Sequence, residues 1–428
     1  MGLQRAIDKD LIHGKLATHL KDSTTSNTLL RIAHSERLRP NRLGYAVASI
    51  DIVATAQPTM VRPVRFAIIS DPHIALPHTI VHTPQRFHLV EVSIPAIEQI
   101  LRSLATQQLD FLLLPGDLTQ HGERENHDWL VNRLQQLPFP TYVVPGNHDI
   151  IDRAGNDRTI GLADFPQLYR DFGYTGDHPY YHQELQPGIH LIGLNSIAFD
   201  EEGQQLFSGF VDRPQLDWLS TTLETLRDDW VMVALHHNVL EHLPGQACHP
   251  MGCRYITQNR EDLIKRLQQG QVNLLFTGHL HVQDIAQEEN LWEITTGSLV
   301  SYPHPYRILT LTPQSSDRLE LAVESHRVQA VPDWPNLQAT SRQWMRDRSQ
   351  NFMARFLMSP PFNLSPDKAA FYALDLQDFW ADISAGDSRF DYEQFPAEIN
   401  RLFQSFGAVD AVGNYRAIDN QATLQFVR

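Results

Sequence analysis

The feature that most constrains this chain is a strand-like apolar segment that ends abruptly in chemically active side chains. Residues 141–150 read TYVVPGNHDI. The β-branched and aromatic residues at the start favour a buried strand, and a proline and a glycine end it. Asn147, His148 and Asp149 follow at once. An amide, an imidazole and a carboxylate therefore stand together at the end of one predicted strand.

The same pattern recurs at the ends of four other predicted strands. Each apolar segment is followed by acidic or imidazole side chains of the types that bind metals. In open α/β sheets functional sites lie at the carboxyl ends of the strands, so we expect all five groups to meet. The four groups are Asp71-Pro72-His73, Gly116-Asp117, His236-His237 and Gly278-His279-Leu280-His281.

The spacing within these groups suits shared ligation. Residues two apart in an extended segment point to the same side. We therefore expect Asp71 and His73 to bind one ion together, and likewise His279 and His281. Glycines precede three of the candidate ligands and allow tight turns beside the site.

The ligand types predict a centre with two metal ions. Imidazoles combined with carboxylates suit Zn²⁺, Fe or Mn²⁺ better than Ca²⁺. The set is too large for one ion, and Asp117 is available as a bridge. Two ions about 3.5–4 Å apart can ionise a water and hold a phosphoryl group for in-line attack. Any one group alone is typical of an ordinary turn, but five in succession favour a metal site. The candidate ligands are Asp71, His73, Asp117, Asn147, His236, His279 and His281.

The rest of the pattern predicts the domain organisation. Strands and helices alternate from about residue 64 to 312, which indicates an α/β sheet covered by helices. Ser365 and Pro366 are typical of a helix start and Gly386 of its end. We expect an N-terminal extension over residues 1–62, a main domain over 63–327 and a helical C-terminal appendage over 328–428.

The net charge and the cysteine content limit the kinds of partner and the cellular compartment that we expect for this protein. The formal net charge of −15 disfavours a nucleic acid polymer as partner, although bound cations can still attract an anionic substrate. Two cysteines indicate a reducing compartment. The sequence has neither a signal-peptide pattern nor an apolar run of membrane-spanning length. We expect a cytoplasmic protein with a small phosphorylated substrate and no membrane contact, and leave a homodimer through the C-terminal helices open.

The ordered motifs resemble those of the calcineurin-like metallophosphoesterases. That family carries Asp-x-His, Gly-Asp, Gly-Asn-His-Asp/Glu, His and Gly-His-x-His, which match this chain over about residues 64–312. The resemblance implies an α/β fold of four layers, αββα, with two mixed sheets between helices. It also implies two metal sites that share Asp117. One would use Asp71, His73, Asp117 and His281, and the other Asp117, Asn147, His236 and His279.

Within the family, the local motifs look most like those of bacterial class III cyclic-nucleotide phosphodiesterases. Those enzymes often carry His-His-Pro-Pro, whereas this chain has His236-His237-Asn238-Val239. The resemblance implies a phosphodiesterase, with a 3′,5′-cyclic nucleotide as one candidate substrate and a metal-bridging hydroxide as nucleophile. A phosphomonoesterase, a nucleotide pyrophosphatase and a non-catalytic interaction module are the alternatives.

Several side chains beside the ligands have expected roles. His148 follows a ligand and is the predicted catalytic residue, because an imidazole can protonate a leaving alkoxide. Asp149 either orients His148 or caps a turn. His237 is expected to have a structural or substrate-side role. The remaining histidines in polar context are expected at the surface or the pocket rim: His78, His82, His121 and His127.

Overall fold

The computed structural model describes residues 62–82, 86–410 and 412–428. The predicted N-terminal extension lies outside these residues. The first of two six-stranded mixed sheets has the order β12-β11-β10-β1-β2-β3, in which β1, β2 and β3 are parallel and the others antiparallel. Its strands are β1 (Val64–Ile68), β2 (Phe111–Leu114), β3 (Thr141–Val143), β10 (Pro305–Ser315), β11 (Arg318–Arg327) and β12 (Gln421–Val427).

The second sheet has the order β4-β5-β6-β7-β9-β8. Four neighbouring strands, from β5 to β9 in this order, are parallel, and β4 and β8 add antiparallel edges. Its strands are β4 (Tyr181–Gln186), β5 (Ile189–Gly193), β6 (Trp230–Ala234), β7 (Leu274–Thr277), β8 (Asp284–Glu288) and β9 (Leu291–Thr295).

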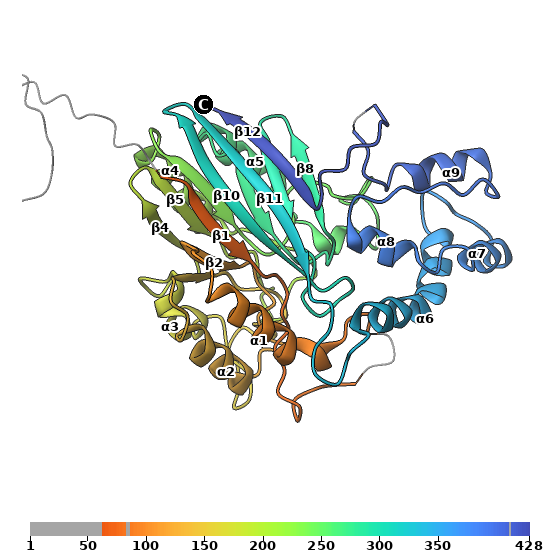
Figure 1. Cartoon of the computed structure of the whole chain (residues 1–428), viewed down its shortest axis with the longest axis horizontal. Helices are drawn as coiled ribbons and strands as arrows, with labels where there is room; N and C mark the ends of the chain where they lie inside the picture. The colour runs from red at the N-terminus through yellow and green to blue at the C-terminus, as the bar shows by residue number, and fades with distance from the viewer. Residues whose placement is uncertain (1–61, 83–85, 411) are drawn as a thin grey trace, which may run out of the picture. The chain divides into compact units, whose positions relative to one another are not determined.

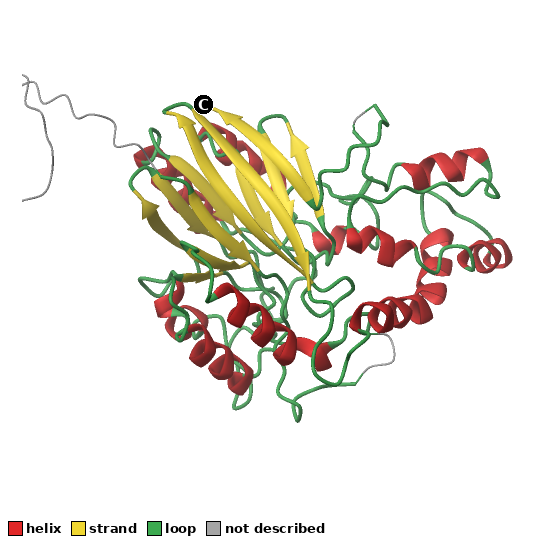
Figure 2. Cartoon of the chain, in the orientation of Figure 1, coloured by secondary structure: helices red, strands yellow, loops and turns green. Residues whose placement is uncertain are grey.

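The two sheets lie against each other, and helices cover them (Figures 1 and 2). Side-chain alternation along the strands accounts for this packing. In β6, Met232 belongs to the apolar cluster between the sheets, whereas Val231 and Val233 face α4 (Arg213–Thr225) and α5 (Arg260–Gln269). The other α-helices of the main domain contribute to the first cluster: α1 (Ser93–Leu104), α2 (Arg124–Leu134) and α3 (Phe165–Leu168). The order helix, sheet, sheet, helix is the predicted four-layer fold.

The C-terminal helices pack against the main domain through their own apolar cluster. Leu280 and Val282, beside the candidate ligands, belong to this cluster together with Met353 and Phe379. The appendage therefore supports the loop that carries His279 and His281. Its helices are α6 (Leu337–Met358), α7 (Pro366–Ala373), α8 (Phe379–Ala385) and α9 (Ala397–Gln404).

The predicted continuous helix from Pro366 to Gly386 is wrong. The chain forms α7 and α8, which are separated by turns. Leu376 is fully buried between them, while Asp378 forms an ion pair with Arg346 of α6. These two tertiary contacts stabilise the turns between α7 and α8, where the sequence predicts a continuous helix. After α9 the chain returns to the first sheet as β12, so the appendage ends in the main domain.

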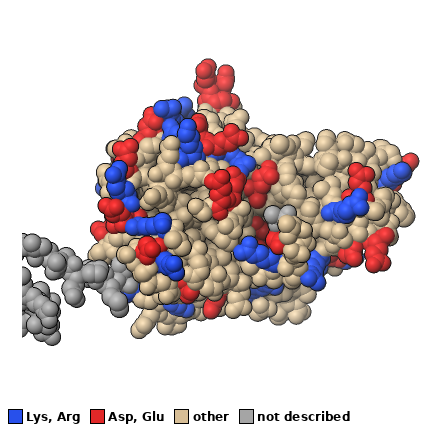
Figure 3. Space-filling view, turned by 90° about the horizontal axis from the view of Figure 1, so that it is seen from above, with Lys and Arg blue, Asp and Glu red and all other residues tan. Residues whose placement is uncertain are grey.

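The surface carries both signs of charge. On the face seen in Figure 3, Lys and Arg side chains are interspersed with Asp and Glu side chains. Within residues 62–82, 86–410 and 412–428, no helix has the length and apolar character that crossing a membrane requires.

Candidate metal centre

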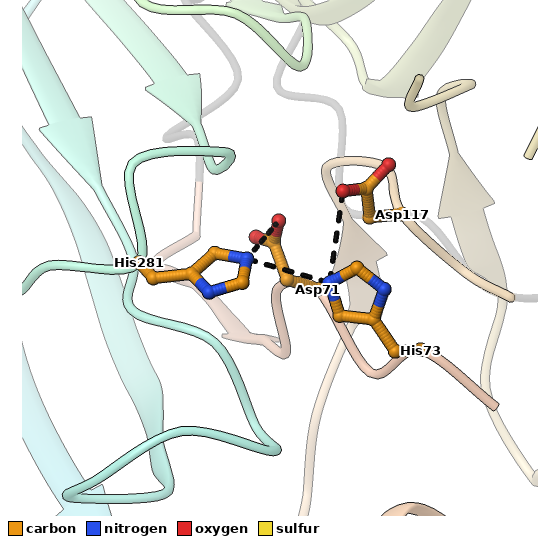
Figure 4. Close-up of side chains that lie close together, drawn as sticks. All are labelled: Asp71, His73, Asp117 and His281. Atoms are coloured by element: carbon orange, nitrogen blue, oxygen red, sulfur yellow. Dashed lines mark hydrogen bonds and ion pairs between the residues drawn. The ribbon is translucent and has the colours of Figure 1, made fainter. Parts of the chain in front are cut away.

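The loops that follow three strands bring four side chains together in the first candidate site (Figure 4). Asp71 and His73 follow β1, Asp117 follows β2 and His281 follows β7. Each offers one nitrogen or oxygen atom, and these atoms all lie within 4.8 Å of one another. Nε2 of His73 lies 3.3 Å from Nε2 of His281 and 3.6 Å from Oδ2 of Asp117. Such convergent donors can hold one cation.

A second group shares Asp117 with the first. It consists of Asp117, His236 and His279, whose potential ligand atoms again lie within 4.8 Å of one another. Oδ1 of Asn147 is 3.1 Å from Nε2 of His236, which places the predicted amide ligand in the same group. Asp117 is thus common to both groups, which is the position that a carboxylate bridging two metal ions would occupy.

The backbone at these residues differs from the extended geometry predicted above. Five candidate ligands have positive φ angles between 42° and 65°. The left-handed region is sparsely populated by residues other than glycine and costs about 1–3 kcal/mol per residue. The side chains converge because of this conformation, and not because they alternate along a strand. Strain concentrated at one spot is typical of a functional site. The five are Asp71, His73, Asp117, His279 and His281.

Two of the glycines are required by the close approach of neighbouring ligands. Gly116 has φ +93°, and a Cβ atom there would overlap the imidazole of His236. A Cβ atom at Gly278 would overlap the side chains of Ser70 and Asp71. Gly278 does not have a positive φ angle, so its role is to leave space and not, as predicted, to turn the chain.

Hydrogen bonds to backbone carbonyls fix which nitrogen of two imidazoles is free. Nδ1–H of His236 donates to the carbonyl of Pro115 (2.9 Å), and Nε2–H of His279 donates to that of Arg254 (3.2 Å). Because a carbonyl oxygen only accepts, the bonded nitrogen carries a proton, and the opposite nitrogen of each ring is the one left to bind a metal ion. Metal-binding histidines are typically oriented in this way.

The pKa values in the cluster favour ligation as well. Burial lowers the pKa of His73 and of His279 well below the usual range, so both rings are neutral and have a lone pair. Burial also lowers the pKa of His236, but the Asp117 carboxylate more than offsets it and raises the pKa to about 9. A cation at this position would displace that proton. The donor set therefore fits two transition-metal ions.

The Asp149 carboxylate bonds to main-chain N–H groups of the loops around it. It accepts the N–H groups of Leu118, Thr119 and Gly146 at 2.8–3.1 Å. It thereby ties the loop of Asp117 to the loop of Asn147. Of the two roles left open by the sequence, the turn cap is the one observed.

His148 lies at the edge of the first group. Its main-chain N–H donates to Oδ1 of Asp117 (2.8 Å), and Nδ1–H donates to the carbonyl of Gln120 (2.6 Å). The ring centre is 4.8 Å from that of His73. Since Nδ1 is occupied, Nε2 is the atom available to a substrate.

His88 is a site residue that the sequence reasoning missed. Its ring is stacked on that of His73 with centroids 4.8 Å apart, and its centroid is 5.7 Å from that of His281. Nε2 is buried without a hydrogen-bond partner among the described residues. No motif surrounds His88, because it follows a loop and not a strand.

The other histidines are distributed as follows. His78 and His82 are exposed as predicted, and His121 is stacked on His148 at 5.4 Å, at the rim. The prediction for His127 is wrong, because its side chain is buried and Nδ1 lies 2.8 Å from the hydroxyl of Tyr169. His237 is buried and hydrogen-bonded to Ser196, as its expected structural role requires.

Comparison with known families identifies the class of protein. Residues 64–283 match the family described as Calcineurin-like phosphoesterase. The match covers half of the chain and includes all seven candidate ligands. The chain therefore belongs to the calcineurin-like phosphoesterases and is a metal-dependent phosphoric ester hydrolase. This confirms the resemblance stated above and the predicted fold class.

Individual relatives share only about a quarter of their aligned residues with this chain. A 3′,5′-cyclic-nucleotide phosphodiesterase of Nostoc sp. is 26% identical over 231 residues, which cover 54% of this chain and 76% of the relative. A probable cyclic nucleotide phosphodiesterase of Moraxella catarrhalis is 28% identical over 40% of this chain and 58% of its own length. A probable glycerophosphodiester phosphodiesterase of Arcobacter nitrofigilis is 24% identical over 40% and 56%.

A solved structure also aligns with the chain. It is a dimetal phosphatase from Danio rerio, which is 15% identical, with a TM-score of 0.46, over 60% of this chain and 95% of that one.

Proposed function

We propose that this chain hydrolyses a small phosphodiester, and that a 3′,5′-cyclic nucleotide is one candidate substrate. The observation that carries the proposal is the pair of ligand groups that share Asp117, with the free nitrogen of His148 beside them. Relatives named as cyclic nucleotide and glycerophosphodiester phosphodiesterases support a diester. Those activities belong to the relatives, and a substrate assay on this chain tests the proposal.

The seven candidate ligands divide between two metal positions in this proposal. When bound, two divalent or mixed-valence ions of Fe, Mn or Zn would supply an acidified water nucleophile and neutralise charge on the phosphoryl group. The protein holds the first position with Asp71, His73 and His281 and the second with Asn147, His236 and His279. Asp117 would serve both. The carbonyls of Pro115 and Arg254 keep two of the imidazoles in the ligating orientation.

His148 would act on the leaving group. Its Nδ1–H is held by the carbonyl of Gln120, so the ring can rotate little and Nε2 faces the site. A proton at Nε2 can be donated to the departing alkoxide, which an unactivated ester requires. The ring of His88, which is stacked on that of His73, lies beside the first ligand group.

The decisive experiment compares ester classes on the purified full chain. Bis(p-nitrophenyl) phosphate, p-nitrophenyl phosphate, cyclic AMP and glycerophosphocholine are each supplied with Mn²⁺, Fe²⁺ or Zn²⁺. We expect the nitrophenyl diester to be cleaved faster than the monoester and the cyclic nucleotide to be hydrolysed measurably. A clear preference for the monoester would contradict the proposed diesterase activity and indicate a phosphomonoesterase.

A reducing compartment, the cytoplasm, is part of the same proposal. Cys248 and Cys253 are both free thiols, and Cys248 is exposed. Exposed thiols persist where disulfide formation is disfavoured. Localisation of a tagged full-length chain in its host would test this.

A further inference from the structure

An apolar pocket lies between the loop of residues 243–255 and helices α6, α8 and α9. It has about 610 Å³ of empty space, including the part open to solvent. Among the described residues that line it, none is Asp, Glu, Lys or Arg. The lining includes Met251, Tyr255, Phe352, Phe356, Leu402 and Phe406.

One wall of the pocket continues into the second ligand group. The ring of Tyr255 lines the pocket, and its centroid is 5.0 Å from that of His279. The preceding residue, Arg254, accepts the N–H of the same imidazole with its carbonyl. Two adjacent residues therefore separate the pocket from a candidate metal ligand.

A second wall continues into the first ligand group. Phe352 lines the pocket and packs against Phe87 with ring centroids 5.5 Å apart. The next residue is His88, whose ring is stacked on that of His73. Leu280, which lies between the ligands His279 and His281, packs in the same apolar cluster as the pocket helices. The pocket thus shares wall residues and packing contacts with both ligand groups.

Gln246 and Nδ1 of His249 are already engaged in hydrogen bonds, whereas Nε2 of His249 is buried without a partner among the described residues. Oε1 of Gln246 accepts the main-chain N–H groups of His242 and Leu243, and its Nε2 donates to Asn238. Nδ1 of His249 accepts the N–H of Met251 (3.0 Å). A group rich in hydrogen-bonding atoms would lose its water without equivalent partners here, and burying such groups is costly. The chemistry of the pocket favours an apolar occupant.

We propose that this pocket binds the apolar part of one ester group of the substrate, an alkyl or aryl group, while the phosphoryl group lies at the metal centre. This inference rests on the proposed function, because it places the phosphoryl group at the two ligand groups. The C-terminal appendage then acts as the specificity element of the enzyme. Its rings supply one side of the pocket, and the loop that follows His236 supplies the other.

The test measures binding, so that it does not depend on turnover. The Mn²⁺-loaded full chain is titrated by calorimetry with methylphosphonate and with hexylphosphonate, which differ only in the length of the apolar group. The longer chain of hexylphosphonate would bury additional methylene groups, which is favourable, so we expect it to bind at least ~10-fold more tightly than methylphosphonate. Equal affinity, or no binding of either probe, would overturn the proposal.

Two substitutions, one on each of two opposite walls of the pocket, test whether the hexyl chain binds there. Leu402→Trp and Met251→Trp each fill the pocket and should abolish most of the advantage of the hexyl group, with little change for the methyl group. Phe371→Trp is the matched control, because Phe371 is on α7 with 66% of its surface exposed. If all three variants retain the wild-type preference, the alkyl chain binds elsewhere and the assignment fails.

Parallel activity assays separate this inference from the proposed function. A chain that cleaves diesters but does not distinguish the two phosphonates refutes the pocket assignment alone. A chain that binds hexylphosphonate tightly but cleaves no ester refutes the proposed function while the pocket assignment stands.

Discussion

Asn238 donates its side-chain amide to the buried carboxylate of Glu293 over 3.1 Å. The same carboxylate accepts the main-chain N–H groups of Val239 (2.9 Å) and Leu240 (2.6 Å), and Oε1 lies 3.1 Å from Nε2 of His242. Glu293 therefore fixes the loop that follows the paired histidines. Related phosphodiesterases often have two prolines at this position, and here hydrogen bonds to one carboxylate hold the loop.

Glu293→Gln should destabilise the protein substantially. The amide would present donors to N–H groups that need acceptors, and it would leave His242 with only Asp284 as a charged partner. Breaking such a buried pair costs roughly 3–5 kcal/mol, which urea unfolding would measure. Glu288→Gln is the matched control, since Glu288 is half exposed and pairs with Arg260. If both substitutions reduced the free energy of unfolding equally, Glu293 would have no special role in fixing this loop.

Asp117→Asn should weaken the binding of both metal ions and abolish activity. The substitution removes a negative charge from the two groups at once, because Asp117 belongs to both. His281→Ala should weaken one ion first, since His281 belongs only to the first group. Metal analysis of the purified variants, with Asp128→Asn as a surface control, checks both statements. An Asp117→Asn protein with two metals and full turnover would exclude the bridging position.

Much of the site could be predicted because its signals are local. Each ligand follows a short run of buried apolar residues, and parallel strands place their ends at one edge. Alternating buried residues also mark β12, where Ala422, Leu424 and Phe426 face inward. The strand lies beyond the helices of the appendage, in a region where the sequence analysis predicts helices alone.

Other features depend on tertiary contacts, which cannot be recognised in a single sequence. The longest helix, α6, buries Ser341 and Ser349 on the same stripe as Met345 and Met353. Small polar residues interrupt the apolar periodicity, so the sequence pattern did not indicate this helix. His88 was missed for a related reason, since its place in the site results from the packing of its segment and not from a motif.

His148→Ala should affect substrates according to their leaving groups. A cyclic nucleotide releases an unactivated alkoxide that needs a proton, whereas p-nitrophenolate leaves without one. We expect a loss of roughly 10²–10⁴-fold in kcat/KM for the cyclic nucleotide and a much smaller loss for bis(p-nitrophenyl) phosphate. Losses of equal size for both substrates would exclude His148 as the proton donor.

A chain that begins at Met60 should fold and keep its rate. All seven candidate ligands and His148 follow this residue, and the strands of both sheets begin at Val64. The comparison is the solubility and kcat/KM of the shortened and the full chain with the same metal. A shortened chain that remains insoluble after refolding, or has only a trace of activity, would place the first 59 residues within the folded core.

Acid should destabilise the fold through His127. Its Nε2–H faces the carbonyl of Asp149 (3.3 Å) and Nδ1 accepts the hydroxyl of Tyr169 (2.8 Å), so the ring is neutral. Burial lowers its pKa to about 3, whereas an unfolded histidine has a pKa near 6.5. Above that value neither state binds the proton. As the pH falls from about 6.5 towards 3, only the unfolded chain binds it, and stability is lost.

The expected loss is measurable by denaturant unfolding at two pH values. One such histidine should reduce the free energy of unfolding by up to ~2 kcal/mol between pH 7 and pH 5. His127→Gln cannot titrate, so its stability should depend less on pH by that amount. His78→Gln, whose side chain is 66% exposed in the native protein, should retain the wild-type dependence. A His127→Gln variant with an unchanged pH dependence would show that this imidazole is not the neutral buried group described here.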